Sequence, residues 1–246
     1  MGIGYRVIVR PALRVQDSEK AHGRALMMLR FLSANPFTRG ILSLLYRPRK
    51  KLTVKCFGQT YKHPFGNAAG LDKRAEALRG WEAIGLSFIE IGGVTEHEQE
   101  GNPKPRMFRA SSSLSLVNRM GFNNPGSIKV ASKLKQHFSR HGSPNIPLWA
   151  NLGKSKITPL DQAPGDYAAT MDRLWEYCDT FVINVSSPNT PNLRELQHDD
   201  ALESIIEACQ EVNSRHSKSS KKSLKPLLIK IAPDVTDEQL TAIVHT

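Results

Sequence analysis

Beyond residue 55, short apolar runs alternate with stretches of helical periodicity. The apolar runs lie at residues 63–69, 87–91, 147–151, 180–185 and 226–231. The helix-like stretches lie at residues 73–84, 165–177 and 199–213. The interval 96–146 is too long for one crossover, so we expect an excursion there before its helix. Buried strands that alternate with helices are typical of a parallel sheet. The pattern therefore predicts an α/β domain of about five βα units, with a polar loop over 214–225.

Residues 1–55 follow a different pattern, which predicts one helix over 17–34 and a second over 37–46. Ser18 can cap the first helix, and Asn35-Pro36 ends it. Apolar residues recur in it at helical spacing, namely Ala21, Ala25, Met28 and Leu32. Two interpretations of this amphipathic pair stay open. It either packs on its own domain as a helical hairpin, or lies in a membrane surface with its apolar face among the headgroups.

Charge is concentrated in the same N-terminal segment. The chain of 246 residues has a net charge of +11, and residues 1–55 hold twelve Lys or Arg against two acids. A basic end on a nearly neutral body favours attachment to a surface and argues against nucleic-acid binding. No apolar run reaches the ~18–20 residues that span a bilayer, and no signal peptide is evident. Three separated cysteines, at 56, 178 and 209, argue against a disulfide framework or a zinc site.

Polar residues gather where each predicted strand ends. The five ends carry AGLDK (69–73), GGVT (92–95), Asn151 with GKS (153–155), NVSSPNT (184–190) and Lys230. Ligands of parallel α/β folds bind at the carboxyl ends of the strands, so we expect one shared site. Lys230 is flanked by isoleucines, and a buried lysine needs a partner, which favours an anion there. GNAAGLDK continues with Arg74 instead of Ser or Thr, so a Walker phosphate loop is not predicted.

Seven collinear motifs carry a resemblance to a known family. AGLDK, IEIGGVT, EGNPKPRMFR, NRMGFNN, NLGKSK, INVSSPNTPNLREL and IKIAPD occur in this order. Together they closely resemble class 2 dihydroorotate dehydrogenases, the membrane-associated enzymes that reduce quinones, along essentially the whole chain. The resemblance implies a (β/α)8 barrel that binds FMN, oxidises dihydroorotate to orotate in pyrimidine synthesis, and passes electrons to ubiquinone or menaquinone.

The same resemblance assigns roles to individual residues. Ser187 matches the catalytic base, and Thr190 and Phe122 match the exit path of the proton. The substrate would be bound by Lys73, Asn118, Arg119, Met120, Gly121, Phe122, Asn184 and Asn189. FMN would be bound by Ala69, Gly70, Leu71, Asp72, Lys73, Gly93, Asn151, Asn184 and Lys230. His22 and Arg109 match positions that face the quinone, and no metal is expected.

The chain departs from the family pattern at two places. Gly93 stands where the family usually has Thr or Ser, so a hydroxyl contact to the flavin is lost. The sequence also stops at Thr246, with five of eight barrel strands and without the glycine-rich phosphate segments. We therefore expect a fragment of a longer gene product or a natural truncation, which by itself binds FMN poorly and is inactive. Stoichiometric flavin retained through gel filtration would contradict this expectation.

The sequence predicts two functional units. Residues 1–55 form a basic helical module for the membrane and the quinone, and residues 56–246 form the incomplete FMN-binding barrel. The expected location is the cytoplasmic side of a bacterial inner membrane, with the mitochondrial inner membrane as the alternative. The alternative function is that of a truncated barrel without activity that binds only membranes or partners.

Overall fold

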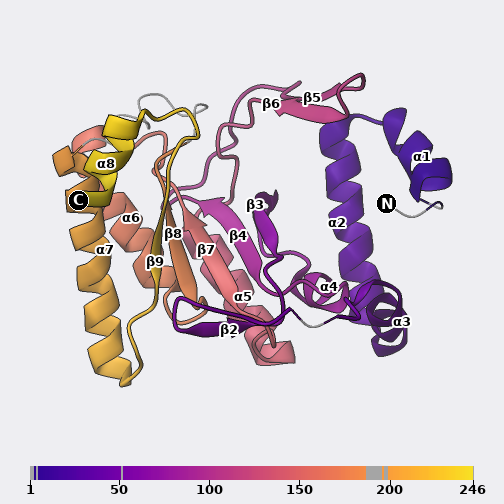
Figure 1. Ribbon diagram of the computed structural model, residues 1–246, viewed down its shortest axis with the longest axis horizontal. Helices are drawn as coiled ribbons and strands as arrows, with labels where there is room; N and C mark the ends of the chain where they lie inside the picture. The colour runs from indigo at the N-terminus through magenta and orange to yellow at the C-terminus, as the bar shows by residue number, and fades with distance from the viewer. Residues whose placement is uncertain (1–2, 4, 51, 187–195, 197–198, 246) are drawn as a thin grey trace.

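The computed structural model describes residues 3, 5–50, 52–186, 196 and 199–245. Its centre is a sheet of five parallel strands in the order β3-β4-β7-β8-β9 (Figure 1). The strands are β3 (Asn67–Asp72), β4 (Ile89–Val94), β7 (Leu148–Leu152), β8 (Thr180–Asn184) and β9 (Leu227–Lys230). Each strand pairs with the next one along the chain, as in a barrel, whereas a doubly wound sheet would reverse its order. The five predicted strands and the α/β class are confirmed.

The first strand begins later than the sequence pattern predicts. Residues 63–66 precede β3 and form no strand, and the ring of His63 binds the carbonyl oxygen of Gly85 at 2.8 Å. Strand β3 extends to Asp72, so the AGLD segment (69–72), which was predicted at the end of the strand, lies within it.

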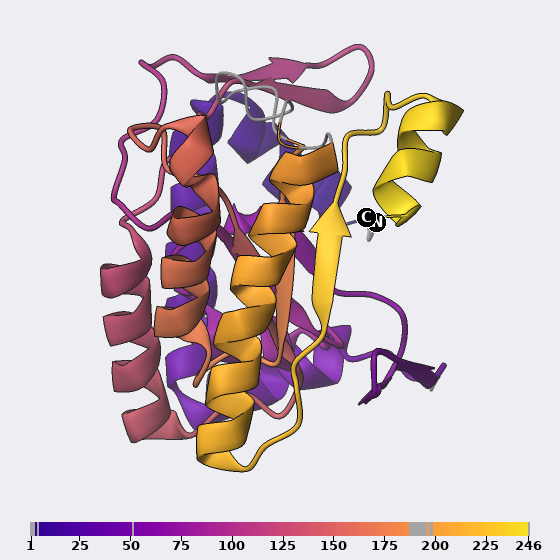
Figure 2. The same ribbon diagram turned by 90° about the vertical axis from the view of Figure 1, so that its left-hand side faces the viewer.

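Helices α5 (Ser127–His141), α6 (Ala163–Leu174) and α7 (Asp199–Ser220) lie side by side over one face of the sheet (Figure 2). Tyr167 and Met171 of α6 are fully buried, as is Phe181 of β8. Burial of each large apolar side chain contributes about 1.5–3 kcal/mol, so this layer holds the main core. The short element η2 (Leu160–Gln162) precedes α6 along the chain, and α8 (Asp237–His245) follows β9.

Two predicted helices have different lengths in the structure. The helix predicted over 73–84 is α4 (Leu78–Ala83), because the buried carboxylate of Asp72 accepts backbone N–H groups of Glu76 and Ala77 and holds them in a loop. Helix α7 continues to Ser220, so the predicted loop over 214–225 was wrong in its first half. The ring of His216 stacks on Trp175 at 4.9 Å between centroids, which anchors these polar turns to the core.

The N-terminal helices α2 (Ser18–Ala34) and α3 (Pro36–Tyr46) confirm the two predicted helices, and η1 (Tyr5–Val9) and α1 (Arg10–Arg14) precede them. Asp17 caps α2 in place of the predicted Ser18, since the backbone N–H of Lys20 donates to its carboxylate at 2.9 Å. Helix α2 packs on α4 and lies beside the sheet (Figure 1).

The packed face of α2 is rotated from the predicted one. Ala21, Leu26 and Ser33 are buried, whereas Met28, which was predicted on the apolar face, is 63% exposed. An apolar surface therefore remains on the outside of this helix. None of the helices in the described part of the chain is long and apolar enough to cross a bilayer.

Two hairpins mark opposite ends of the sheet. The predicted excursion contains β5 (Met107–Ala110) and β6 (Ser115–Asn118), an antiparallel pair that reaches over to the top of α2 (Figure 1). The pair β1 (Val54–Cys56) and β2 (Gln59–Tyr61) lies at the other end, ahead of β3. The first hairpin and α2 thus enclose the space above the carboxyl ends of the strands.

Candidate active site

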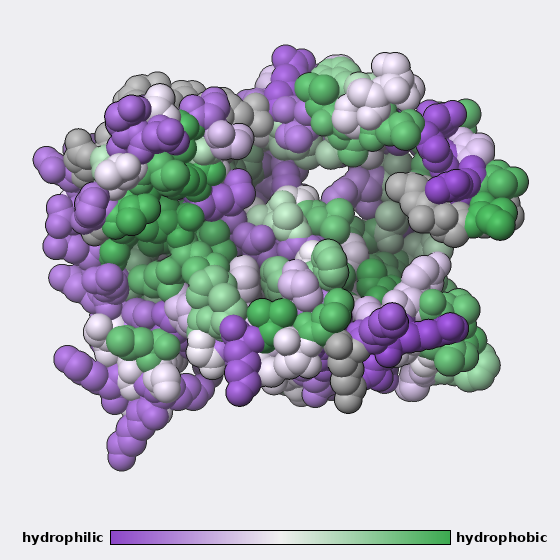
Figure 3. Space-filling view, in the orientation of Figure 1, coloured by the Kyte–Doolittle hydropathy of each residue, from purple (hydrophilic) through white to green (hydrophobic). Residues whose placement is uncertain are grey.

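A cavity of about 780 Å³ lies between the carboxyl ends of the strands, helix α2 and the β5–β6 hairpin. Figure 3 shows the surface hollowed beneath this hairpin. Twelve of the predicted site residues line the cavity, namely His22, Ala69, Gly70, Asp72, Lys73, Gly93, Asn118, Met120, Gly121, Phe122, Asn184 and Lys230. They come from α2, from the carboxyl ends of four strands of the sheet, and from the last residue of β6 with the segment that follows it. Four of the five predicted strand ends thus meet at one cavity, the end of β7 does not line it, and the individual roles stay predictions.

Four predicted residues do not line this cavity. Asn151 is fully buried behind it, and Leu71 is 40% exposed. Arg119 is exposed and donates to the carbonyl oxygen of Pro105 at 3.1 Å. Arg109, on β5, donates to the carbonyl oxygen of Gln16, which ties the hairpin to the segment ahead of α2. The remaining three predictions, Ser187, Asn189 and Thr190, fall outside the described residues.

Among the cations that line this cavity, Lys73 has the most strongly shifted pKa. Its ammonium group donates to the side-chain oxygen of Asn123. Burial, together with the nearby Arg106 guanidinium, lowers the pKa of Lys73 to about 8. Among the described residues, no carboxylate lies at hydrogen-bond distance from this half-buried ammonium, which is therefore suited to receive the carboxylate of a ligand.

This lowered pKa makes anion binding at the cavity dependent on pH. Lys73 is charged below about pH 8 and becomes neutral above it, so affinity for orotate, the ligand that the sequence resemblance implies, should fall as pH rises, by about tenfold per pH unit well above the pKa. Equilibrium dialysis of orotate between about pH 6 and 9 measures this profile. The Lys73→Arg variant is the matched control, because a guanidinium stays charged and its profile should be flat. A flat profile in the unaltered protein would contradict the assignment.

Asn184 lines the cavity, and it is held from behind by Asn151 and by a carboxylate that the sequence analysis missed. The Asn184 amide donates to the Asn151 side-chain oxygen at 2.9 Å, and the Asn151 amide donates to Glu90 at 2.8 Å. The other oxygen of Glu90 accepts the backbone N–H of Ala69 at 3.0 Å. Glu90 therefore sets the orientation of both amides and of the β3 backbone. The signal in the sequence was a single acid inside the apolar strand IEIGGV.

Lys230 is exposed, which corrects the expectation that it is buried, while the anion expected beside it stays a prediction. β9 lies at one edge of the described sheet, so its side chains are reached by solvent. The Lys230 ammonium donates to the Ser186 hydroxyl at 3.0 Å, and that hydroxyl donates to the Asn184 side-chain oxygen at 2.9 Å. The resulting chain of hydrogen bonds places an ammonium and an amide beside each other on the cavity wall.

The space beside Gly93 is occupied by an aromatic ring. A Cβ atom at residue 93 would lie 2.4 Å from Cε1 of Phe122, and one at Gly153 would lie 3.2 Å from the same atom. Phe122 is thus packed over two glycines at the end of β4 and after β7. A side chain at position 93 is incompatible with this ring position. The glycine that departs from the family pattern at this position therefore leaves room for the Phe122 ring.

Two buried interactions hold the cavity walls in place. The Asp72 carboxylate accepts the Trp81 indole N–H at 2.9 Å, in addition to its backbone contacts, so it fixes the loop that carries Lys73. Arg106, which is 7% exposed, forms an ion pair with Glu19 of α2 at 2.6 Å. Its hydrogen bond lowers the pKa of Glu19. The NPKPR part of the sequence therefore joins the hairpin to the N-terminal helix.

Comparison with known proteins decides the family. The family model described as dihydroorotate dehydrogenase matches residues 51–246. The chain belongs to the dihydroorotate dehydrogenase family. A dihydroorotate dehydrogenase (quinone) of Gloeobacter violaceus is 45% identical over 240 residues, which cover 98% of this chain and 64% of that protein. One from Chloroflexus aurantiacus is 42% identical over 245 residues, with 97% and 66% covered.

A solved structure supports the same relationship. A crystal structure of the Eimeria tenella dihydroorotate dehydrogenase in complex with ferulenol superposes with a TM-score of 0.79 at 33% identity. The match covers 93% of this chain and 63% of that protein. The chain spans 64% of the length of the Gloeobacter relative, and its sheet corresponds to part of the family's barrel.

Proposed function

We propose that this chain provides the substrate site of an enzyme that oxidises dihydroorotate to orotate, with FMN as the internal acceptor and a quinone as the final one. The observation that carries the proposal is the convergence of Lys73, Asn118, Asn184 and Lys230 on one cavity from separate elements. The names of the relatives, dihydroorotate dehydrogenase (quinone), support the reaction and its final acceptor.

The cavity residues fit a flavin ring. Ala69 and Gly70 bring backbone to the wall, and no atom lies within 4 Å of the Cβ position at Gly70, so a flat ring has room there. Asn184 and Lys230 offer an amide and an ammonium to the polar edge of such a ring. Bound FMN supplies a hydride acceptor. The Lys230 ammonium then stabilises negative charge that develops near it, an effect that is strong because the group is already in place.

The substrate half of the cavity fits a planar carboxylate with amide edges. Lys73 pairs with the carboxylate, while the side-chain amides of Asn118 and Asn184 bind ring oxygen and nitrogen atoms. Ser187 accepts the proton from C5 as the hydride leaves C6. A serine hydroxyl is a weak base, so it needs a neighbouring group that takes its own proton. Thr190 and Phe122 are the proposed route by which this proton leaves.

The N-terminal helices are the proposed quinone and membrane module. His22 on α2 lines the cavity, and Arg109 lies on the hairpin above it. Met27 and Phe31 of α2 are 64% and 77% exposed, so an apolar surface adjoins this side of the cavity. We place the protein at the periphery of a membrane, the cytoplasmic side of a bacterial inner membrane, with ubiquinone or menaquinone as the acceptor.

The proposal is tested by turnover of a flavin-loaded protein that contains this sequence. Anaerobic addition of dihydroorotate should bleach the flavin absorbance and form one equivalent of orotate per flavin, and a soluble quinone should restore the colour. Dihydroorotate that leaves the oxidised spectrum unchanged would overturn the proposal. Retention on membranes without any flavin reduction would instead favour the alternative, a protein that only binds membranes or partners.

A further inference from the structure

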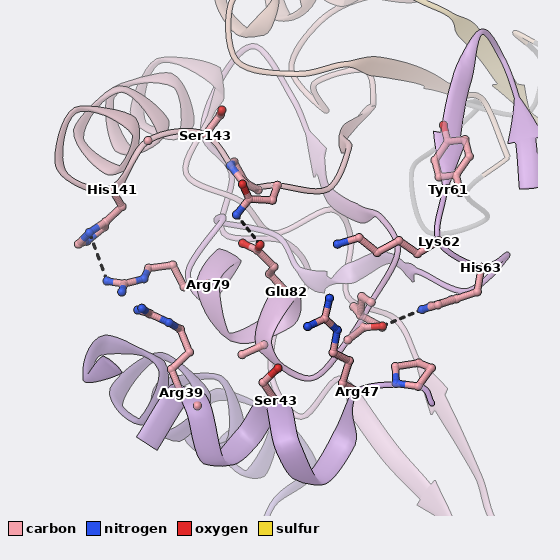
Figure 4. A pocket seen from close by; sticks show the side chains of 18 of the residues that line it. Arg39, Ser43, Arg47, Tyr61, Lys62, His63, Arg79, Glu82, His141 and Ser143 are labelled. Atoms are coloured by element: carbon pink, nitrogen blue, oxygen red, sulfur yellow. Dashed lines mark hydrogen bonds between the residues drawn. The ribbon is translucent and has the colours of Figure 1, made fainter. Parts of the chain in front are cut away.

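A second cavity lies at the opposite end of the sheet from the candidate active site. It has a volume of about 1000 Å³ and is bounded by α3, α4, the end of α5, and the segments around the β1–β2 hairpin (Figure 4). His63, Leu86 and Asn145 line it, and each precedes a strand of the sheet, so the cavity lies at the amino ends of the strands. We call it the basal pocket.

The basal pocket is strongly cationic. Its lining includes the six cations Arg39, Arg47, Arg49, Lys50, Lys62 and Arg79, against one acid, Glu82. Figure 4 shows the side chains of Arg39, Arg47, Lys62 and Arg79 around the pocket, with Arg79 turned toward His141. Like charges gathered around one space repel each other unless an anion occupies it.

The structure offers little compensation for this charge. The Glu82 carboxylate accepts the Asn145 amide at 2.7 Å, and Arg79 donates to a ring nitrogen of His141 at 3.2 Å. Arg39 donates to the carbonyl oxygen of Ser33 at 3.3 Å. Within the described ranges, none of the six cations forms an ion pair with a carboxylate. Converging guanidinium groups with free N–H donors match the oxygens of a phosphate group.

Helix α3 joins this pocket to an exposed apolar surface. Arg39, Ser43 and Arg47 face the pocket at spacings of four residues. The adjoining side of the helix carries Phe37 and Leu44, which are 76% and 83% exposed, and Ile41 and Leu45 lie beside them. Residues four apart share a face of a helix, so cationic and apolar stripes run along the same helix side by side. A soluble phosphate ester would contact only the cationic stripe, whereas a phospholipid would contact the cationic stripe with its phosphate and the apolar stripe with its acyl chains.

We propose that the basal pocket binds the phosphate of an anionic membrane phospholipid, whose acyl chains cover the apolar side of α3. The inference rests on the proposed membrane association and adds to it a headgroup site and an orientation. The amino ends of the strands then face the bilayer near α3. The site is separate from the dihydroorotate cavity, so either proposal can fail without the other.

Vesicle flotation tests the headgroup site. The protein should float with phosphatidylcholine vesicles that contain phosphatidylglycerol more strongly than with phosphatidylcholine alone. Each cation near an anionic surface contributes about fivefold to binding, so Arg47→Gln with Arg79→Gln should lower affinity for the anionic vesicles by about 30-fold. The matched control is Lys135→Gln with Lys218→Gln, which removes the same charge from exposed positions outside the pocket and should change little. If the first pair unfolds by circular dichroism, Arg49→Gln with Lys62→Gln repeats the test at exposed side chains.

Further variants and a phosphate titration test the apolar contact and the identity of the ligand. Phe37→Ser with Leu44→Ser should weaken flotation with both kinds of vesicle, because it removes the apolar contact and leaves the pocket intact. Equal losses in the pocket and control pairs would overturn the proposal, since they would reflect net charge alone. Titration with inorganic phosphate separates the sources. Binding of phosphate that depends on Arg47 and Arg79, without a preference for anionic vesicles, would assign the pocket to a soluble phosphate ester and overturn the lipid assignment.

Discussion

Replacing Lys73 by methionine should weaken orotate binding by about 10- to 100-fold, because a hydrogen-bonded ion pair in a partly buried site contributes about 1.5–3 kcal/mol. Methionine keeps most of the length and the apolar stem of lysine, so the change removes the ammonium with little loss of packing. The measurement is isothermal titration with orotate at pH 7, where Lys73 of the unaltered protein is charged because its pKa is about 8.

Lys156→Met is the matched control for this experiment. Lys156 is exposed and lies outside the cavity, so its loss changes net charge by the same amount and should leave orotate affinity within about twofold. Flavin binding should fall less than orotate binding in Lys73→Met. Equal affinity for orotate in the Lys73 variant and the unaltered protein would remove this residue from substrate binding.

Replacing Ser187 by alanine should slow flavin reduction by dihydroorotate by about 10²–10⁴-fold, the usual contribution of a positioned general base. The yellow colour should persist, because the proposed contacts to FMN do not include Ser187. Stopped-flow absorbance of a flavin-loaded protein that contains this sequence measures the step directly.

Ser187→Cys separates a chemical role from a structural one. A thiol loses its proton at lower pH than a hydroxyl, so this variant should retain part of the rate and move the pH profile of flavin reduction downward. A merely structural serine would give no such shift. An unchanged reduction rate in Ser187→Ala would exclude the residue as the base.

The periodicity of the chain was sufficient to predict the five strands and most helices after residue 55, because burial on both faces leaves continuous apolar runs in parallel strands. The same periodicity failed at 63–66 and 214–220, where side-chain contacts decide the outcome. His63 binds the carbonyl oxygen of Gly85, and His216 stacks on Trp175. Such contacts join residues far apart in the sequence, so no local pattern records them.

The candidate active site likewise contains residues that the sequence identified and residues that only the folded structure revealed. Lys73, Asn118, Asn184 and Lys230 were identified from their places after strands and in family motifs, and they meet at one cavity. Glu90, Asn123 and the Glu19–Arg106 pair were missed, although they orient the amides, hold the Lys73 ammonium and attach α2. Their function depends on their partners, which only the folded chain brings together.

By itself, the sequence determined the α/β class, the family, and the residue types available for an anion and a flat ring, because strand ends and motifs are local features. Tertiary structure alone decided which of these side chains are buried, that Phe122 fills the space at Gly93, and that six cations from separate segments surround the basal pocket. The reason is physical: burial and electrostatic interaction depend on distances in space, and segments such as α3 and α4 become neighbours only when the chain has folded.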